Sequence, residues 1–184
     1  MAYLATLDEF KTYAGLKNPE NDERNEAILA NVSSLIKTYC GRTVVDYVSD
    51  DYEEYFDGGA DYLYLKEFPI LNIGSVEYSA DYGITYTELG NNLEGWVQDR
   101  RNERIFIAPS YRTSGPNTIK VTYTGGYESG APMDLKLAVF DMMQMYLKAE
   151  TTPKKTQGFT SVEFIKTADF PSHIKRVLDL YRVL

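Results

Sequence analysis

The sequence predicts an α+β protein: a small α-helical bundle with a large inserted antiparallel β block and a C-terminal arm helix. Two changes of hydrophobic period support this fold class. Apolar residues recur with helical spacing up to residue 40, alternate with period two from residue 43 to residue 124, and return to helical spacing beyond residue 133. The 184 residues are enough to bury a core without disulfide bonds.

The first two helices carry recognisable start and stop signals. Thr6 and Glu9 have the spacing of a capping box, which predicts a helix over residues 6–14 that stops at Gly15. A longer helix is expected over residues 23–40, with its apolar residues on one side and Gly41 at its end. A one-sided apolar stripe predicts that this helix packs against a core.

Residues 43–124 form the predicted β block. Short runs rich in Val, Ile, Thr and Tyr are divided by Asp-Gly-Gly, Phe-Pro, Gly-Asn-Asn and Ser-Gly-Pro breaks, so we expect antiparallel strands joined mainly by hairpins. The last strand stops at Gly125 and Gly126, where glycine permits a positive φ or a close backbone approach. The expected strands are TVVDYV, YEEYF, DYLYLKEF, IGSVEYS, ITYTEL, GWVQD, RIFIA and TIKVTYT.

The helix expected over residues 133–149 is apolar around most of its circumference. Pro132 suits its first turn. Its polar residues occupy a narrow arc, and Lys136 is the one polar residue outside that arc. Such a helix must be covered on more than one side.

The C-terminal part of the chain differs from the rest in charge. Residues 1–150 contain 13 basic and 24 acidic residues, whereas residues 151–184 contain 6 basic and 3 acidic residues. This asymmetry predicts that the tail lies on an acidic surface, either its own or a neighbour's, unless it arose by chance. We expect a body in residues 1–150, a polar linker in residues 151–158 (TTPKKTQG) and an arm in residues 159–184 with a strand SVEFIK and a final helix. The apolar stripe of that helix comprises Ile174, Val177, Leu178, Tyr181 and Leu184.

Composition excludes several classes of protein. The formal net charge of −8 argues against wrapping nucleic acid by counterion release. The single cysteine, Cys40, cannot form an intramolecular disulfide bond or a zinc site, which favours a reducing cytosol. The N-terminus lacks the features of a signal peptide, and no run of eighteen apolar residues predicts a membrane span.

Catalytic, metal-binding and cofactor-binding signatures are missing from the sequence, so we expect a protein that is not an enzyme and needs no cofactor. The only histidine, His173, lies at the start of the last helix and is expected to be solvated or packed rather than a general base. Asp57-Gly-Gly-Ala-Asp61 lacks the ligand spacing of a calcium loop. The acidic run over residues 50–57 is interpreted as a solvated strand edge, and Arg100, Arg101 and Arg104 as a basic hairpin tip.

The order of these elements resembles the head-tail connector (adaptor or head-completion) proteins of tailed double-stranded-DNA bacteriophages. The resemblance covers almost the whole chain and rests on six weak motifs in the right order. The β block over about residues 76–118 is longer than in the smaller members of that family. The motifs, as they stand in this sequence, are TLDEFKTYAGL, LIKTYCGRT, YFDGGADYLYLKEFPILNIGSVEYS, VTYTGGY, APMDLKLAVFDMM and VLDLYRVL.

The resemblance implies a homo-oligomeric ring, commonly of twelve subunits, docked under the portal in the neck of a virion assembled in the host cytoplasm. The next neck or tail protein would bind its other side, and DNA would pass through an acidic ring without tight binding. The arm, residues 159–184, would dock on the portal, although packing on its own domain is the alternative. The candidate subunit interface, for which an intramolecular core is the alternative, comprises Phe140, Met142, Met143 and Met145.

Two other interpretations remain open. Within the virion, the protein would act as a stopper or tail-completion protein of the neck. From a different class, the tyrosine-rich β block would suit a carbohydrate-binding or adhesion module, because aromatic rings stack on sugar faces. The helix that is apolar on all sides gives no support to the carbohydrate-binding interpretation.

Overall fold

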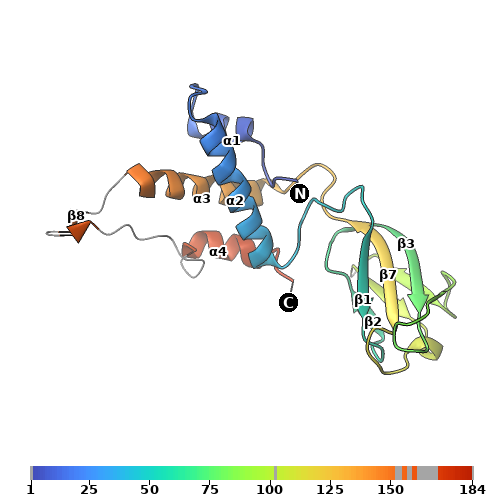
Figure 1. Ribbon diagram of the computed structural model, residues 1–184. Helices are drawn as coiled ribbons and strands as arrows, with labels where there is room; N and C mark the ends of the chain where they lie inside the picture. The colour runs from blue at the N-terminus through green and yellow to red at the C-terminus, as the bar shows by residue number, and fades with distance from the viewer. Residues whose placement is uncertain (1, 102, 152–154, 157–158, 161–169, 184) are drawn as a thin grey trace. The chain divides into compact units, whose positions relative to one another are not determined.

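The computed structural model divides the chain into a helical unit and a β unit (Figure 1). The helical unit comprises Met1–Arg42 and Ser129–Leu184, and the β unit comprises Thr43–Glu128. The structure describes residues 2–101, 103–151, 155–156, 159–160 and 170–183. The combination of helices with antiparallel sheets confirms the predicted α+β class, including the insertion of the β block between helices.

Local sequence signals place the ends of the first two helices correctly. The Thr6 hydroxyl accepts a hydrogen bond from the Glu9 amide at 3.2 Å, and the Glu9 carboxylate accepts one from the Thr6 amide at 2.8 Å. Gly15 and Gly41 both have positive φ angles, of 67° and 70°, and terminate their helices in the left-handed conformation. The helices of this unit are α1 (Leu7–Ala14), α2 (Asp22–Cys40), α3 (Met133–Thr151) and α4 (Ser172–Asp179).

The core of the helical unit forms where α2 meets α3 and where α4 packs on both of them. One face of each helix supplies it, as the one-sided stripe of α2 predicts. The apolar side chains of this unit that are at most 1% exposed are Leu4, Phe10, Leu29, Val32, Ile36, Cys40, Leu135, Val139, Met142, Met143, Ile174 and Leu178.

The β unit contains two antiparallel sheets. The first has the strand order β1-β7-β3-β4, and the second has the order β2-β6-β5. Their inward-facing side chains share one apolar cluster, which includes Trp96, Val121 and Tyr123. The strands are β1 (Tyr52–Phe56), β2 (Tyr62–Tyr64), β3 (Ile70–Tyr78), β4 (Thr87–Glu88), β5 (Trp96–Asp99), β6 (Arg104–Ile107) and β7 (Ile119–Gly125).

Two predictions about the β block are wrong. Residues 43–48 (TVVDYV) form turns and bends rather than a strand, and Val44 has a φ of 74°, which is incompatible with an extended strand. Hairpins are also fewer than expected, because β1 pairs with β7 from the far end of the block and β2 pairs with β6. Non-local pairing of this kind leaves no signal in the turn residues between consecutive strands.

A buried polar network surrounds Tyr123, which is 0% exposed. The Tyr123 hydroxyl donates to the Glu54 carboxylate at 2.8 Å and accepts from the Glu67 amide at 2.9 Å. The Glu67 carboxylate, itself buried, accepts from the amides of Thr43 and Val44. The network therefore ties the segment that enters the β unit to the strand that leaves it.

The glycine pair at the end of β7 allows the backbone to pass close to this network. A Cβ atom on Gly125 would lie 2.3 Å from the carbonyl oxygen of Glu67, and one on Gly126 would lie 2.4 Å from the carbonyl oxygen of Val44. Gly126 also has a φ of 114°, which side-chain-bearing residues rarely adopt. Both properties that glycine offers, close approach and positive φ, are used at this turn.

The C-terminal segment differs in detail from the expected linker and arm. Within residues 151–158, Thr151 still belongs to α3, and β8 (Lys155–Thr156) pairs with β9 (Phe159–Thr160). The expected strand SVEFIK, residues 161–166, lies outside the described residues. The final helix is present as α4, and it packs within the helical unit against α2 and α3.

Candidate docking surface on the helical unit

Helix α3 is buried on one side and carries exposed apolar side chains on another. Met133 is 74% exposed and Leu137 is 45% exposed, whereas Leu135 and Val139 are fully buried. Exposed methionine and leucine one turn apart form an apolar strip on the first half of the helix. A strip of this kind on a helix is typical of a surface that another chain covers.

Helix α1 lies against the same half of α3 through aromatic contacts. The ring of Phe140 lies 6.0 Å from that of Phe10 and stacks at 5.2 Å on that of Tyr13. The Tyr13 hydroxyl donates to Asp141 at 2.9 Å, and this hydrogen bond raises the pKa of Tyr13. Tyr13 is nevertheless 44% exposed, so its ring adds apolar surface beside α3.

An ion pair closes one end of the space between α1 and α3. Lys136, the one polar residue outside the polar arc of its helix, donates to the Glu9 carboxylate at 2.6 Å. This hydrogen bond to Lys136, more than any other interaction, lowers the pKa of Glu9. The pairing accounts for a charged residue on an otherwise apolar side of α3.

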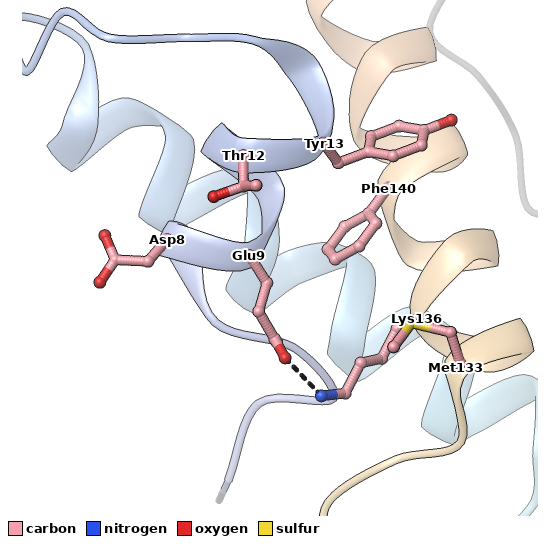
Figure 2. Close-up of a pocket in the computed structure, with 7 residues that line it drawn as sticks. All are labelled: Asp8, Glu9, Thr12, Tyr13, Met133, Lys136 and Phe140. Carbon is pink, nitrogen blue, oxygen red and sulfur yellow. Dashed lines mark hydrogen bonds and ion pairs between the residues drawn. The ribbon is translucent and has the colours of Figure 1, made fainter.

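A pocket of about 440 Å³ opens between the two helices (Figure 2). Figure 2 shows the Tyr13 ring over the Phe140 ring, and the Glu9–Lys136 pair below them. The pocket is thus apolar in its interior and charged at its edge, a form suited to an apolar side chain of another protein. Its lining residues are Asp8, Glu9, Thr12, Tyr13, Met133, Lys136 and Phe140.

Helix α4 also packs on α3, and in the view of Figure 1 α1 and α4 lie on either side of α3, while Asp141 of α3 contacts both of them. Just beyond the C-terminal end of α4, the Tyr181 hydroxyl donates to Asp134 at 2.7 Å. At the N-terminal end of α4, Nε2 of His173 lies 3.8 Å from Oδ2 of Asp141. The outward side of α4 carries the exposed side chains of Arg176 and Leu180, and Leu180 is 73% exposed.

The residues predicted for a subunit interface lie mostly in the interior of the monomer. Met142 and Met143 are at most 1% exposed and Phe140 is 6% exposed, so these side chains belong to the intramolecular core that was the alternative interpretation. Met145 is half-buried. Among the described side chains of α3, the large apolar ones that are exposed are instead Leu137 and Met133, about one and two turns N-terminal to Phe140.

The residues predicted for a portal-docking arm are divided in the same way. Ile174 and Leu178 are buried against the helical unit, while Val177 and Tyr181 are half-buried. Leu184 lies outside the described residues. The apolar stripe of α4 is therefore covered within its own subunit, and contacts with another protein would use the outward side of this helix.

Polar residues that suggested chemistry have structural partners. Asp57 accepts a hydrogen bond from the Asn117 amide at 3.0 Å, and Asp61 pairs with Arg112 at 2.6 Å. The interpretation of residues 50–57 as a solvated edge is wrong for Glu54, which is half-buried in the Tyr123 network, and burial raises its pKa. Arg104 lies within β6 rather than at a hairpin tip.

The described residues contain no group of three or more His, Cys, Asp or Glu side chains that could hold a metal ion. No helix in the part of the chain that the structure describes is both long and apolar enough to cross a membrane. Cys40 is buried, and this burial raises the pKa of its thiol to about 11, so the thiolate required for nucleophilic chemistry is not formed at neutral pH. The surface described above is suited to binding rather than to catalysis.

A family model described as "Head completion protein" (HCP) matches residues 3–184. The chain belongs to the head completion protein family. Membership of this family confirms the resemblance inferred from the sequence motifs and, with it, the prediction of a structural protein rather than an enzyme. A search of curated protein sequences finds no match.

Solved structures with a similar fold come from particles of gene transfer agents (GTA). A chain in the neck of an empty GTA particle, computed with C6 symmetry, is 16% identical with a TM-score of 0.60, over 98% of this chain and 90% of that chain. A chain in the neck of a native GTA particle, computed with C12 symmetry, is 19% identical with a TM-score of 0.52, over 90% of this chain and 88% of that chain. A third, from the virion of a native GTA particle, is 19% identical with a TM-score of 0.50, over 86% and 78% of the two chains. These similarities support the fold of the head completion protein described here.

Proposed function

We propose that this protein is a structural component of the neck of a phage-like particle, where copies of it form a ring under the portal and join the filled head to the next neck or tail protein. The observation that carries the proposal is the family match along residues 3–184. The neck structures with C6 and C12 symmetry, in which similar chains occur, support a ring of copies.

The helical unit supplies the subunit contact in this proposal. Met133 and Leu137 take the place of the buried Met142 and Met143, because only an exposed side chain can be covered by a neighbour. Met145, which is half-buried, lies further along the same helix and is a weaker candidate. Burying an exposed leucine or methionine side chain stabilises an interface by about 1.5–3 kcal/mol.

The two units differ in net charge, and this difference affects how DNA would pass the protein. The β unit contains 15 acidic and 6 basic residues, a net charge of −9, whereas the helical unit contains 12 acidic and 13 basic residues. A surface with the charge of the β unit repels DNA phosphates, so DNA would pass it without adhesion. The portal is our proposed partner for the arm, residues 159–184, in which the exposed Lys175 and Arg182 are suited to an acidic surface.

The experiment that tests the function is deletion of the gene followed by complementation. Particles made without the protein are expected to lose packaged DNA and to lack tails, and the wild-type gene is expected to restore both. The Met133→Glu/Leu137→Glu variant is expected to fold but to fail to restore them. Deletion particles that retain DNA and attach tails normally would contradict the proposal.

The two alternatives predict different outcomes in the same experiment. A stopper or tail-completion protein would be found further from the portal, so imaging of labelled protein in the neck distinguishes it from an adaptor. A carbohydrate-binding module would leave assembly of the particle unaffected and would alter only attachment to cells.

A further inference from the structure

The pocket between α1 and α3 has a chemical character that restricts its occupant. Its interior is formed by Tyr13, Met133 and Phe140, so the occupant must present an apolar side chain. Asp8, in the acidic first turn of α1, is exposed at the edge of the pocket. The side chain of Glu9 is also partly exposed there. An apolar group with a cation beside it fits both features.

One side chain of the same protein has this character. Leu180 is 73% exposed, compared with 44% for Tyr3 and 41% for Leu16. It is the most exposed large apolar residue described in the helical unit, apart from the residues of the pocket and of the adjoining strip. Arg176 lies one turn before Leu180 on the same side of α4 and is also exposed. The two residues thus combine an apolar tip with a neighbouring positive charge.

Side chains of the β unit are less suitable occupants. Ile84 and Leu93 are 81% and 77% exposed. They belong to a unit with a net charge of −9, however, and the carboxylates beside the pocket would repel it. Charge complementarity therefore selects α4 rather than the loops of the β unit.

The positions of the two surfaces determine how copies would associate. The pocket lies where α1 meets α3, whereas the C-terminal end of α4 contacts α3 at Asp134 through Tyr181, and Leu180 of the same copy is not among the residues that line the pocket. A contact between two different surfaces is heterologous and repeats from copy to copy, which closes a ring when the rotation allows it. An isologous contact would instead stop at a dimer.

We propose that Leu180 of one copy inserts into the α1–α3 pocket of the next copy, with Arg176 beside Asp8 of that copy. This inference rests on the proposed ring and specifies which surfaces form it. The pocket volume of about 440 Å³ exceeds that of a leucine side chain, so the aliphatic part of Arg176 also fits at its edge.

Charge reversal tests the polar part of the contact. Asp8→Lys and Arg176→Glu are each expected to reduce incorporation of the protein into particles at least tenfold, and the double variant Asp8→Lys/Arg176→Glu is expected to restore most of it. Both positions are exposed, so the thermal unfolding of the isolated variants should match that of the wild type. A double variant no better incorporated than the single variants would overturn the pairing.

Disulfide cross-linking tests the apolar part independently. Thr12 lines the pocket and is exposed, and the natural Cys40 is buried, so new thiols at residues 12 and 180 can be oxidised selectively. In purified particles, the Thr12→Cys/Leu180→Cys variant is expected to give a ladder of cross-linked oligomers, whereas each single variant gives none.

The outcomes separate this inference from the proposed function. Particles that contain normal amounts of the double-cysteine protein but give no ladder would overturn the contact and leave the ring proposal standing. Cross-linking of Thr12→Cys alone to another neck protein would also overturn it and would identify that protein as the occupant. Absence of the wild-type protein from purified particles would overturn both proposals.

Discussion

The hydroxyl group of Tyr123 is predicted to be essential for the stability of the β unit. The substitution Tyr123→Phe keeps the ring but removes the hydroxyl group. The Glu67 amide then loses its hydrogen-bond acceptor, and the Glu54 carboxylate loses one of its hydrogen-bond donors. Loss of a partner by a buried backbone amide costs about 1–3 kcal/mol, and a hydrogen bond to a charged group contributes about 1.5–3 kcal/mol. Because Glu54 retains a hydrogen bond from the Lys66 amide, we expect a total loss of about 3 kcal/mol in the free energy of unfolding.

Urea unfolding followed by tryptophan fluorescence measures this loss directly. The chain has one tryptophan, Trp96, and it lies in the core of the β unit, so the signal reports on that unit. With an m value of about 1.5 kcal/mol/M, the midpoint should fall by about 2 M. Tyr55→Phe is the matched control, because the Tyr55 hydroxyl bonds Glu53 at the surface and its loss should change the free energy by less than about 0.5 kcal/mol. A difference of about 0.3 M is close to the precision of such measurements. A urea midpoint of Tyr123→Phe within about 0.3 M of the wild-type midpoint would therefore refute the reasoning.

Three further predictions concern other parts of the molecule. Burial raises the pKa of Glu54, so the folded state binds a proton more tightly than the unfolded state, and the free energy of unfolding should fall as pH rises from about 4.5 through the raised pKa. In urea titrations at several pH values, Glu54→Gln should remove this dependence of stability on pH, and an unchanged dependence would contradict the prediction. Gly126→Ala should destabilise the β unit by about 2 kcal/mol or more in the same unfolding assay. Gly59→Ala is the matched control in the same unit, because Gly59 has a similar φ of 105° but only the Ser114 hydroxyl oxygen lies within 4 Å of an added Cβ, and it should cost only about 1 kcal/mol. Equal losses would contradict the close approach at Gly126. Met133→Glu/Leu137→Glu should leave the melting temperature of the isolated protein within a few degrees of the wild type, yet block incorporation into particles, and normal incorporation would exclude this strip from the interface.

Local signals in the sequence predict the helical unit well because its boundaries depend on neighbouring residues. Thr6 and Glu9 cap α1 as their spacing predicts, and Gly15 ends it in the left-handed conformation. The amphipathic period of α2 likewise predicts which of its sides is buried. Each of these features is decided within one or two turns of helix.

Features that depend on distant residues could not be predicted in the same way. The pairing of β1 with β7 brings together residues that are distant in the sequence, and it places Glu54 beside Tyr123, 69 positions away. Residues 43–48 have the composition of a strand, but the Glu67 carboxylate binds the amides at positions 43 and 44 and holds this segment in turns. Tertiary contacts override β propensity at this point.

The sequence did not show which apolar residues of α3 remain exposed in the monomer, for a related reason. A helix that is apolar on nearly every side does not reveal which apolar residues its own subunit covers. Only the positions of α1, α2 and α4 show that Met142 and Met143 are buried while Met133 and Leu137 remain exposed. The signal present in the sequence was the position of Leu137, which at 100° per residue lies within the polar arc formed by Asp134, Asp141, Gln144 and Lys148.

The central claim is that this head completion protein joins head to tail as a component of the neck, and complementation of particles that lack it tests this claim most directly. The fraction of particles that retain DNA and carry tails should fall to near zero on deletion and return with the wild-type gene, but not with Met133→Glu/Leu137→Glu. Full DNA retention and normal tail attachment in particles from which the protein is absent would contradict the claim.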